Sequence, residues 1–155
     1  MRANSQVLRA EGLHVILPMF IGGLIYLLFR VDTLLMFQWV DALGLAGPLA
    51  AARASVAGFG AALPPWFLFS LPDGLWLYAF GAQMVILHRE SVLPVRVFWI
   101  CLAPLLALVG EAGQAFGWIP GTFDVVDVLF FSMVSLGVVL LERSVAVRWA
   151  PLHSK

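Results

Sequence analysis

Charged residues are scarce in this chain, and neither sign of charge is in excess. Only 12% of its 155 residues are charged and 62% are hydrophobic, whereas soluble domains are about a quarter charged and half apolar. The 9 basic and 9 acidic residues cancel, so the overall charge does not favour nucleic acid as a partner. The composition excludes an ordinary soluble domain and predicts one integral membrane domain over residues 1–155.

Cysteine is almost absent as well. The single cysteine, Cys101, excludes an internal disulfide and a thiolate metal cluster, and its place in an apolar run predicts a buried, unreactive thiol. His14 and His88 fall on the opposite side of the predicted membrane from most carboxylates, which argues against a histidine–carboxylate zinc site. The chain has no glycine-rich phosphate loop and no G-x-S-x-G turn. We therefore expect no bound metal and no cofactor.

What the chain does have is long apolar runs, which are typical of membrane-spanning helices of about 20 residues. Four such runs cover residues 13–29, 71–87, 95–117 and 123–141, with approximate bounds. The predicted fold is an all-α membrane protein, a bundle of four transmembrane helices.

The segment of about 31–63, between the first two runs, allows two interpretations. Residues 34–40 are apolar, but Asp41 closes this stretch and Gly44, Gly47 and Pro48 interrupt the pattern. A fifth span over about 34–52 would carry Gln38 and Asp41 into hydrocarbon, where a carboxylate costs a few kcal/mol. We favour one or two short interfacial helices, which lie at the membrane surface.

Two local patterns refine the second and third spans. Ser70, Pro72 and Asp73 are typical of a helix start, with serine as the N-cap, proline in the first turn and aspartate three residues after the cap. In the third span, Gly113 and Gly117 form a GxxxG pattern on a face of small residues. This face favours close packing against another helix of the bundle.

The cations fall mainly on one side of a four-span protein. That side carries Arg2, Arg9, Arg89, Arg96, Arg143, Arg148 and Lys155, and the other side carries Arg30 and Arg53. The positive-inside rule then predicts a multi-pass protein of an inner (plasma) membrane with both termini in the cytoplasm. Most acids fall on the outer side, namely Asp32, Asp41, Asp73, Glu111, Asp124 and Asp127.

Polar side chains recur where the predicted spans reach this outer side. Glu111 and Gln114 lie three residues apart at the end of the third span, so they are neighbours on a helix. Asp124 and Asp127 repeat this spacing at the head of the fourth span. Because successive spans reverse direction, we expect one polar pocket at this depth. Its predicted members are Arg30, Asp73, Glu111, Gln114, Asp124 and Asp127.

Helix capping explains only part of this set. The helix dipole favours acids at N-termini, and Thr122 or Asp124 can cap the fourth span. Glu111 stands instead at a helix C-terminus, where the dipole disfavours an anion, so it needs a cation, a proton or water. Arg30 or Arg53 can supply the charge as a structural ion pair. We favour a functional pocket, because ionisable groups at membrane depth are usually functional.

The chain resembles the VanZ-like family of small bacterial membrane proteins in the polar pattern of its C-terminal half. The matching residues are Glu111-x-x-Gln114, Pro120-Gly121, Phe123-Asp124-x-x-Asp127 and Gly137, with Leu71-Pro72-Asp73 and Leu75-Trp76 as an upstream match. Thr122 stands where the family commonly has an arginine, and Phe131 and Ser132 stand where it commonly has an asparagine. The resemblance implies a bacterial cell-envelope protein, and the founding member of the family is associated with resistance to the glycopeptide teicoplanin.

Three functions fit these observations. The first is an envelope protein without catalytic activity, whose outer-side pocket binds a lipid headgroup, an amphiphilic glycopeptide or a cation. The second is an intramembrane carboxylate-dependent enzyme that uses Glu111, Asp124 and Asp127 as acid and base, with Ser135 or water as the nucleophile. The third is a structural subunit of a larger membrane complex, which requires a partner protein. We favour the first, with membrane lipid as the expected partner.

Overall fold

The computed structural model describes residues 2–32 and 35–149, and it describes side chains over 5–32 and 35–144. Every regular element in these ranges is a helix, which confirms the predicted all-α class. The elements are α1 (Arg2–Glu11), the π-helical turn η1 (Gly12–Ile16), α2 (Leu17–Phe29), α3 (Leu35–Ala42), α4 (Ala46–Gly60), α5 (Pro65–Leu68), α6 (Ser70–Leu87), α7 (Leu93–Ala115) and α8 (Val125–Trp149).

Within the described ranges, three helices are long and apolar enough to cross a membrane: Ser5–Phe29, Leu93–Ala115 and Val125–Ser144. They correspond to the first, third and fourth predicted spans. The first begins earlier than predicted because α1, η1 and α2 follow one another without a break. The predicted second span corresponds to α6, which is not one of the three. α6 has 18 residues, and Asp73 and Gln83 lower its apolar character.

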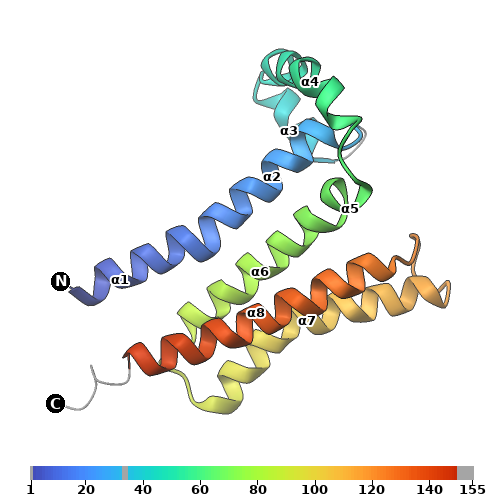
Figure 1. Cartoon of the computed structure of the whole chain (residues 1–155). Coiled ribbons are helices and arrows are strands. Elements are labelled where there is room, and N and C mark those ends of the chain that lie inside the picture. Colours follow the sequence, from blue (N-terminus) through green and yellow to red (C-terminus); the bar gives the residue numbers. More distant parts are fainter. Residues whose placement is uncertain (1, 33–34, 150–155) are drawn as a thin grey trace.

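α6 lies at the centre of the bundle. It packs on η1 and α2 on one side and on α7 and α8 on the other (Figure 1). Among the described side chains, half of the buried hydrophobic ones belong to α6, and the set is Ile25, Ala79, Ala82, Val85, Ile86, Ile100, Phe131 and Val138. A helix enclosed by other helices can carry polar residues that a lipid-facing helix cannot, because they face protein instead of hydrocarbon.

Glycines allow the neighbouring helices to approach α6 closely. A Cβ atom on Gly81 would lie 2.7 Å from Val138 Cγ2 of α8, and one on Gly74 would lie 3.3 Å from Phe130 Cδ1. On the other side, a Cβ atom on Gly22 of α2 would lie 2.6 Å from Trp76 Nε1. The spacing of α2, α6 and α8 therefore depends on the absence of side chains at these positions.

The short helices lie together at one end of the bundle. α1 begins and α8 ends at the opposite end, where α6 also connects to α7 (Figure 1). α3 has 8 residues and α4 has 15, so neither reaches the length of about 20 residues that a spanning helix needs. α4 runs across the long axis of the bundle (Figure 1). The segment of about 31–63 thus forms two short helices before α5, and in the described part of it no helix is long enough for a fifth span.

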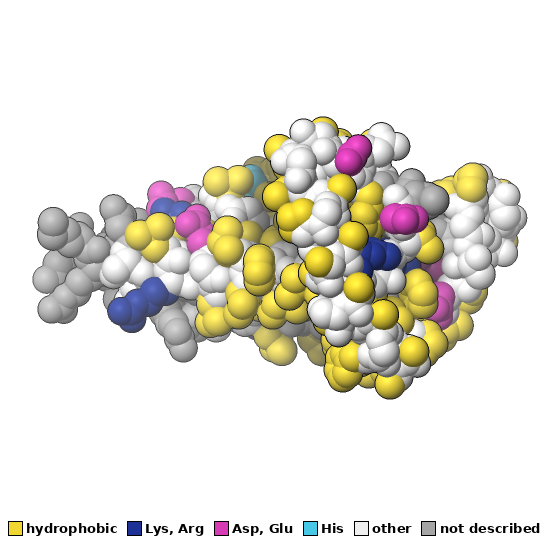
Figure 2. All heavy atoms as spheres, turned by 90° about the horizontal axis from the view of Figure 1, so that it is seen from above, with side chains coloured by type: hydrophobic (Ala, Val, Ile, Leu, Met, Phe, Trp, Pro, Cys, Tyr) yellow, Lys and Arg dark blue, Asp and Glu magenta, His cyan; other side chains and the backbone are white. Residues whose placement is uncertain are grey.

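The long helices present an apolar surface. Phe20 of α2, Leu106 of α7 and Met133 of α8 are each more than 60% exposed. Figure 2 shows charged side chains gathered in two zones, and between them hydrophobic and uncharged groups together with a histidine. Such an apolar zone between charged ends is the surface that a bilayer requires. Cys101 of α7 is also exposed, so the prediction of a buried thiol is wrong.

α7 ends in a Schellman motif, which explains two of its glycines. Gly117 has a φ of 69°, its N–H donates to Gln114 O over 3.0 Å, and the Trp118 N–H donates to Gly113 O over 2.8 Å. Ile119 then folds back onto Gly113, where a Cβ atom would lie 2.6 Å from Ile119 Cδ1. The GxxxG pattern thus serves the turn after α7, and the expectation that these glycines pack against another helix is wrong.

The Gly117→Ala variant should lose about 1 kcal/mol of stability, because an alanine is disfavoured at this positive φ. The thermal unfolding midpoint in detergent measures the loss. Gly110→Ala in α7 is the matched control, since a Cβ atom at Gly110 would have no neighbour within 4 Å. A Gly117→Ala midpoint equal to that of Gly110→Ala would contradict the role of the left-handed residue.

The start of α6 differs from the predicted cap. The helix begins at Ser70 with Phe69 as the N-cap residue, and no side chain caps it. Phe69 has φ −113° and ψ −59° because α5 leads directly into α6, so the extended conformation of a capping residue is not formed. Ser70 therefore lies inside the helix, where its Oγ is buried and has no hydrogen-bond partner among the described residues. Pro72 lies in the first turn, as predicted.

Candidate functional site

The candidate site lies at the end of the bundle where α2 and α7 end and α6 and α8 begin (Figure 1). Antiparallel helices bring residues that are distant in sequence to this end. We use the name polar cluster for the six predicted residues, which are Arg30, Asp73, Glu111, Gln114, Asp124 and Asp127. Their contacts divide them into an ion pair, a helix cap, an unpartnered carboxylate and a turn support.

Arg30 and Asp73 form the ion pair, which joins the end of α2 to the first turn of α6. Arg30 Nη2 lies 4.0 Å from Asp73 Oδ2, and the two side chains are 23% and 37% exposed. The guanidinium also lies over the rings of Tyr26 and Phe69, at 5.1 and 4.8 Å from the ring centres. These rings hold the arginine in place, because a cation is attracted to an aromatic face.

Glu111 and Asp124 cap α8 together. Glu111 is only 7% exposed, and its Oε2 accepts a hydrogen bond of 3.2 Å from the Asp124 backbone N–H. Asp124 Oδ1 in turn accepts a bond of 2.8 Å from the Val126 N–H in the first turn of α8. Each carboxylate therefore satisfies a backbone donor at the helix start, where the dipole favours negative charge. Asp124 was one of two predicted caps, but the contact of Glu111 with a second helix was not predicted.

Asp127 is the carboxylate whose bonding is incomplete. Its Oδ1 is buried and has no hydrogen-bond partner among the described residues, and neither has the buried Nε of Arg30. Asp73 lies within electrostatic range of Asp127 and Glu111 as well as of Arg30. Asp73 thus has one nearby cation and two nearby carboxylates, and the cluster contains one buried acceptor and one buried donor without a partner among the described residues.

Gln114, a predicted member of the polar cluster, contacts the turn that follows α7. Its side-chain amide lies against Gly121, where a Cβ atom would be 2.7 Å from Gln114 Cδ, and Gly121 has a φ of 143°. Gln114 thus packs on the turn between α7 and α8. It therefore supports the turn that leads to Asp124 and Asp127.

The chemistry open to the site is the binding of hydrogen-bond donors and anions. No three His, Cys, Asp or Glu side chains of the described residues converge in a way that could hold a metal ion. Ser135, the candidate nucleophile, donates its hydroxyl to Phe131 O of its own helix over 2.6 Å. The carboxylates suit an ammonium or hydroxyl group, and Arg30 suits an anionic oxygen.

Two polar contacts were missed by the sequence analysis. His14 Nδ1 lies 2.8 Å from the Tyr78 hydroxyl, which ties η1 to α6. Arg53 of α4 donates to Leu27 O and Arg30 O at the end of α2, over 2.7 and 2.8 Å. Neither partner is close in sequence, so no local spacing signalled these contacts. Arg30, and not Arg53, supplies the ion pair of the polar cluster.

The fold and the apolar surface define the class of an all-helical, multi-pass membrane protein with a polar cluster at one end of the bundle. Comparison with known proteins adds no family to this class. No protein-family model, no curated protein and no solved structure matches the chain.

Proposed function

We propose that the chain is a VanZ-like protein of the bacterial inner membrane that crosses the membrane four times, with α6 as the additional span. At about 1.5 Å per residue, the 18 residues of α6 extend about 27 Å, which is close to the hydrocarbon thickness of about 30 Å. α6 also packs between α2 and the α7–α8 pair. Its polar residues Asp73 and Gln83 are compatible with a membrane position, because neighbouring helices cover them in part.

The distribution of cations supports both termini in the cytoplasm. Arg9, Arg89, Arg96 and Arg143 belong to the end of the bundle where α1 begins and α8 ends, and Arg30 and Arg53 belong to the other end. Arg2 and Arg148 belong to the same terminal helices as the first group, and Lys155 lies outside the described residues. The positive-inside rule then assigns the polar cluster to the outer side. α3 and α4 would lie along the outer surface of this inner membrane.

The function that this arrangement supports best is the binding of a polar headgroup by the polar cluster. The observation that carries the proposal is the buried Oδ1 of Asp127, which has no hydrogen-bond partner among the described residues and lies within electrostatic range of Asp73. A buried acceptor without a partner costs about 1–3 kcal/mol, and a ligand that donates a hydrogen bond removes this cost.

A zwitterionic headgroup matches both free groups of the cluster. The ammonium of phosphatidylethanolamine would donate to Asp127, and its phosphate would accept from Nε of Arg30. Amphiphilic glycopeptides also carry amines and hydroxyls next to an apolar part. The shared chemistry is therefore an amphiphile with a hydrogen-bond donor on its polar end.

A structural role of the cluster is the second candidate, and one observation favours it. Glu111 accepts the Asp124 N–H and so couples the end of α7 to the start of α8. A cluster that only locks the bundle would need no ligand. Such a protein would serve as a subunit of a larger membrane complex.

Asp127→Asn should weaken the binding of phosphatidylethanolamine about tenfold, which is about 1.4 kcal/mol, and should not lower the unfolding midpoint. The amide keeps the shape of the carboxylate but loses the charge that attracts an ammonium group. Titration of the lipid into detergent-solubilised protein, followed by native mass spectrometry, measures the binding. Wild type should bind phosphatidylcholine more weakly, because its quaternary amine has no hydrogen to donate.

Glu90→Gln is the matched control, since Glu90 is 64% exposed, pairs with Arg89 and lies after α6 at the opposite end of the bundle. It removes the same charge without contact to the cluster. If Asp127→Asn and Glu111→Gln both lower the unfolding midpoint and neither changes lipid binding, the structural role is correct and the binding proposal fails.

A further inference from the structure

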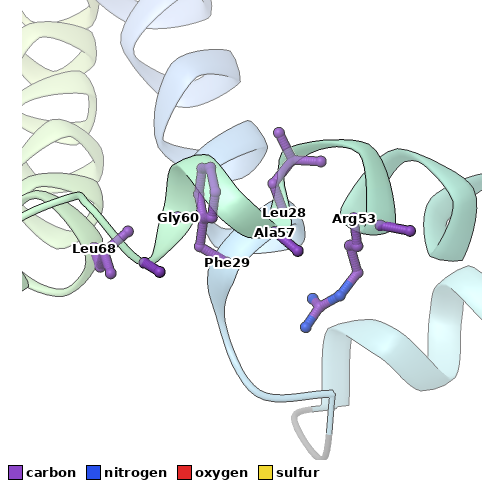
Figure 3. A pocket seen from close by; sticks show the side chains of 8 residues that line it. Leu28, Phe29, Arg53, Ala57, Gly60 and Leu68 are labelled. Atoms are coloured by element: carbon purple, nitrogen blue, oxygen red, sulfur yellow. The ribbon is translucent and has the colours of Figure 1, made fainter.

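A second feature, separate from the polar cluster, is a cavity between the end of α2, α4 and α5. Its volume is about 500 Å³, within the range of about 300–1,000 Å³ typical of small-molecule sites. The lining is apolar apart from one arginine, and it consists of Leu28, Phe29, Arg53, Ala54, Ala57, Gly60, Ala61 and Leu68. Figure 3 shows Arg53 extending from α4 toward the connection that follows α2, with Leu28 and Phe29 of α2 and Leu68 of α5 along the wall.

Arg53 is held rigidly and retains free donors. Its Nη1 and Nη2 donate to Leu27 O and Arg30 O, and its guanidinium lies 5.2 Å from the ring centre of Phe37. A guanidinium has five N–H groups, so three remain for other acceptors. A planar cation fixed in this way suits an anion with several oxygens, such as a phosphate, without further loss of side-chain freedom.

The charges around Arg53 select the side on which an anion can bind. No carboxylate of the described residues lies within ion-pair distance of Arg53. Asp32 and Asp41 line a neighbouring cavity of about 370 Å³ on which Arg53 also borders, so an anion there would meet two carboxylates. The 500 Å³ cavity has no acidic residue in its lining. Arg53 lines both cavities, and the difference in charge between them favours an anion in the larger one.

The surroundings of this cavity are those of a membrane surface. Trp39 of α3, Phe59 of α4 and Trp66 of α5 are 61%, 64% and 45% exposed. Aromatic side chains exposed in this way are enriched at the level of the lipid headgroups. An arginine at this level, next to an apolar cavity, meets the phosphate of a lipid whose chain can enter the cavity.

We propose that the cavity between α2, α4 and α5 binds one anionic phospholipid, with its phosphate on Arg53 and part of an acyl chain against Leu28, Phe29 and Leu68. The lipid would link α4 to the rest of the bundle at the membrane surface. This site uses none of the carboxylates of the polar cluster, so it does not depend on the function proposed for that cluster.

The test is a titration of phosphatidylglycerol into the detergent-solubilised full chain, with native mass spectrometry as the readout. Wild type should bind one phosphatidylglycerol at least fivefold more tightly than phosphatidylcholine. Ala57→Phe should weaken this binding at least tenfold, because the ring fills the cavity while the hydrogen bonds of Arg53 remain. Ala51→Phe on the same helix is the control, since Ala51 is exposed and lines neither cavity.

Two variants of Arg53 test the contribution of its positive charge to lipid binding. Arg53→Lys keeps the charge and should retain part of the preference for phosphatidylglycerol, whereas Arg53→Met should lose it. Equal binding by Ala57→Phe and Ala51→Phe would overturn the proposal, and so would equal affinity of the wild type for the two lipids. Displacement of the lipid by millimolar inorganic phosphate would also overturn it, because the site would then recognise phosphate without the acyl chain.

Discussion

Gly81→Ala should destabilise the bundle by about 1–3 kcal/mol, although replacing glycine by alanine inside a helix normally stabilises it by about 0.5–1 kcal/mol. The new Cβ atom would lie 2.7, 3.0 and 3.4 Å from Cγ2, Cγ1 and Cβ of Val138. Valine is short and branched at Cβ, so it cannot swing away from the added methyl group. The clash is relieved only if α6 and α8 move apart.

Such a movement has a large effect because of where the contact lies. Val138 is 1% exposed and packs with Val85 of α6 and Ile100 of α7 in the hydrophobic core. α6 and α8 also form the most extensive helix pair in the described structure. Separation of these two helices therefore opens the core at its centre, and it removes dispersion contacts that water or lipid does not replace.

Thermal unfolding in detergent distinguishes this clash from a general effect of the substitution. Gly110→Ala, with open space around the new Cβ atom, should be neutral or slightly stabilising. In the Gly81→Ala background, Val138→Ala should restore part of the lost stability although it is destabilising by itself. If Val138→Ala adds its own loss to that of Gly81→Ala, the two residues do not clash.

The sequence determines which segments are long helices, because hydropathy reports directly on them. The first predicted run ends at Phe29, where α2 ends. The third and fourth runs were predicted to begin near Val95 and Phe123, and α7 and α8 begin within two residues of these positions. Capping chemistry is also local, and Asp124 caps α8 as the sequence allowed. The breaks at Gly44, Gly47 and Pro48 correctly indicated short helices between the first two long ones, although Gly47 and Pro48 lie in the first turn of α4.

The sequence does not determine which side of each helix meets which neighbour. Gly113 and Gly117 form the turn after α7, while Gly81 and Gly74, which belong to no such motif, make the close contacts with α8. All glycines offer the same small size, so tertiary packing decides which of them is used. The same limit applies to the hydrogen bond between His14 and Tyr78, whose partners are 64 residues apart.

The candidate site was predictable in its place but not in its pairing. Alternation of span direction was enough to expect Asp73, Glu111 and Asp127 at one end, and Asp73 lies within electrostatic range of both. The interaction of Glu111 with a backbone N–H of α8 depends on the turn from Phe116 to Phe123. Loop geometry of this kind follows from φ values such as that of Gly117, and helix periodicity does not report on it.

Arg30→Met should destabilise the protein by about 1–3 kcal/mol, because it removes the cation that pairs with Asp73, a carboxylate that also lies within electrostatic range of Asp127 and Glu111. The partial exposure of both side chains lets solvent screen part of the charge, which keeps the loss below the 3–5 kcal/mol or so of a fully buried broken pair. Methionine still fills the space beside Tyr26 and Phe69, so lost packing is a minor part of the effect.

A double-mutant cycle identifies the charge as the cause. Asp73→Asn should be tolerated better than Arg30→Met, because it removes a carboxylate that Asp127 and Glu111 repel, together with its need for a cation. The double variant Arg30→Met/Asp73→Asn should therefore be more stable than Arg30→Met alone, with unfolding midpoints in detergent as the measurement. If the double variant is no more stable, Arg30 acts through its contacts with Tyr26 and Phe69, and solvent stabilises the charge of Asp73. Recovery would instead show that Asp73, at the start of α6, needs a neighbouring cation. The ammonium group of a zwitterionic headgroup would meet the same electrostatic requirement.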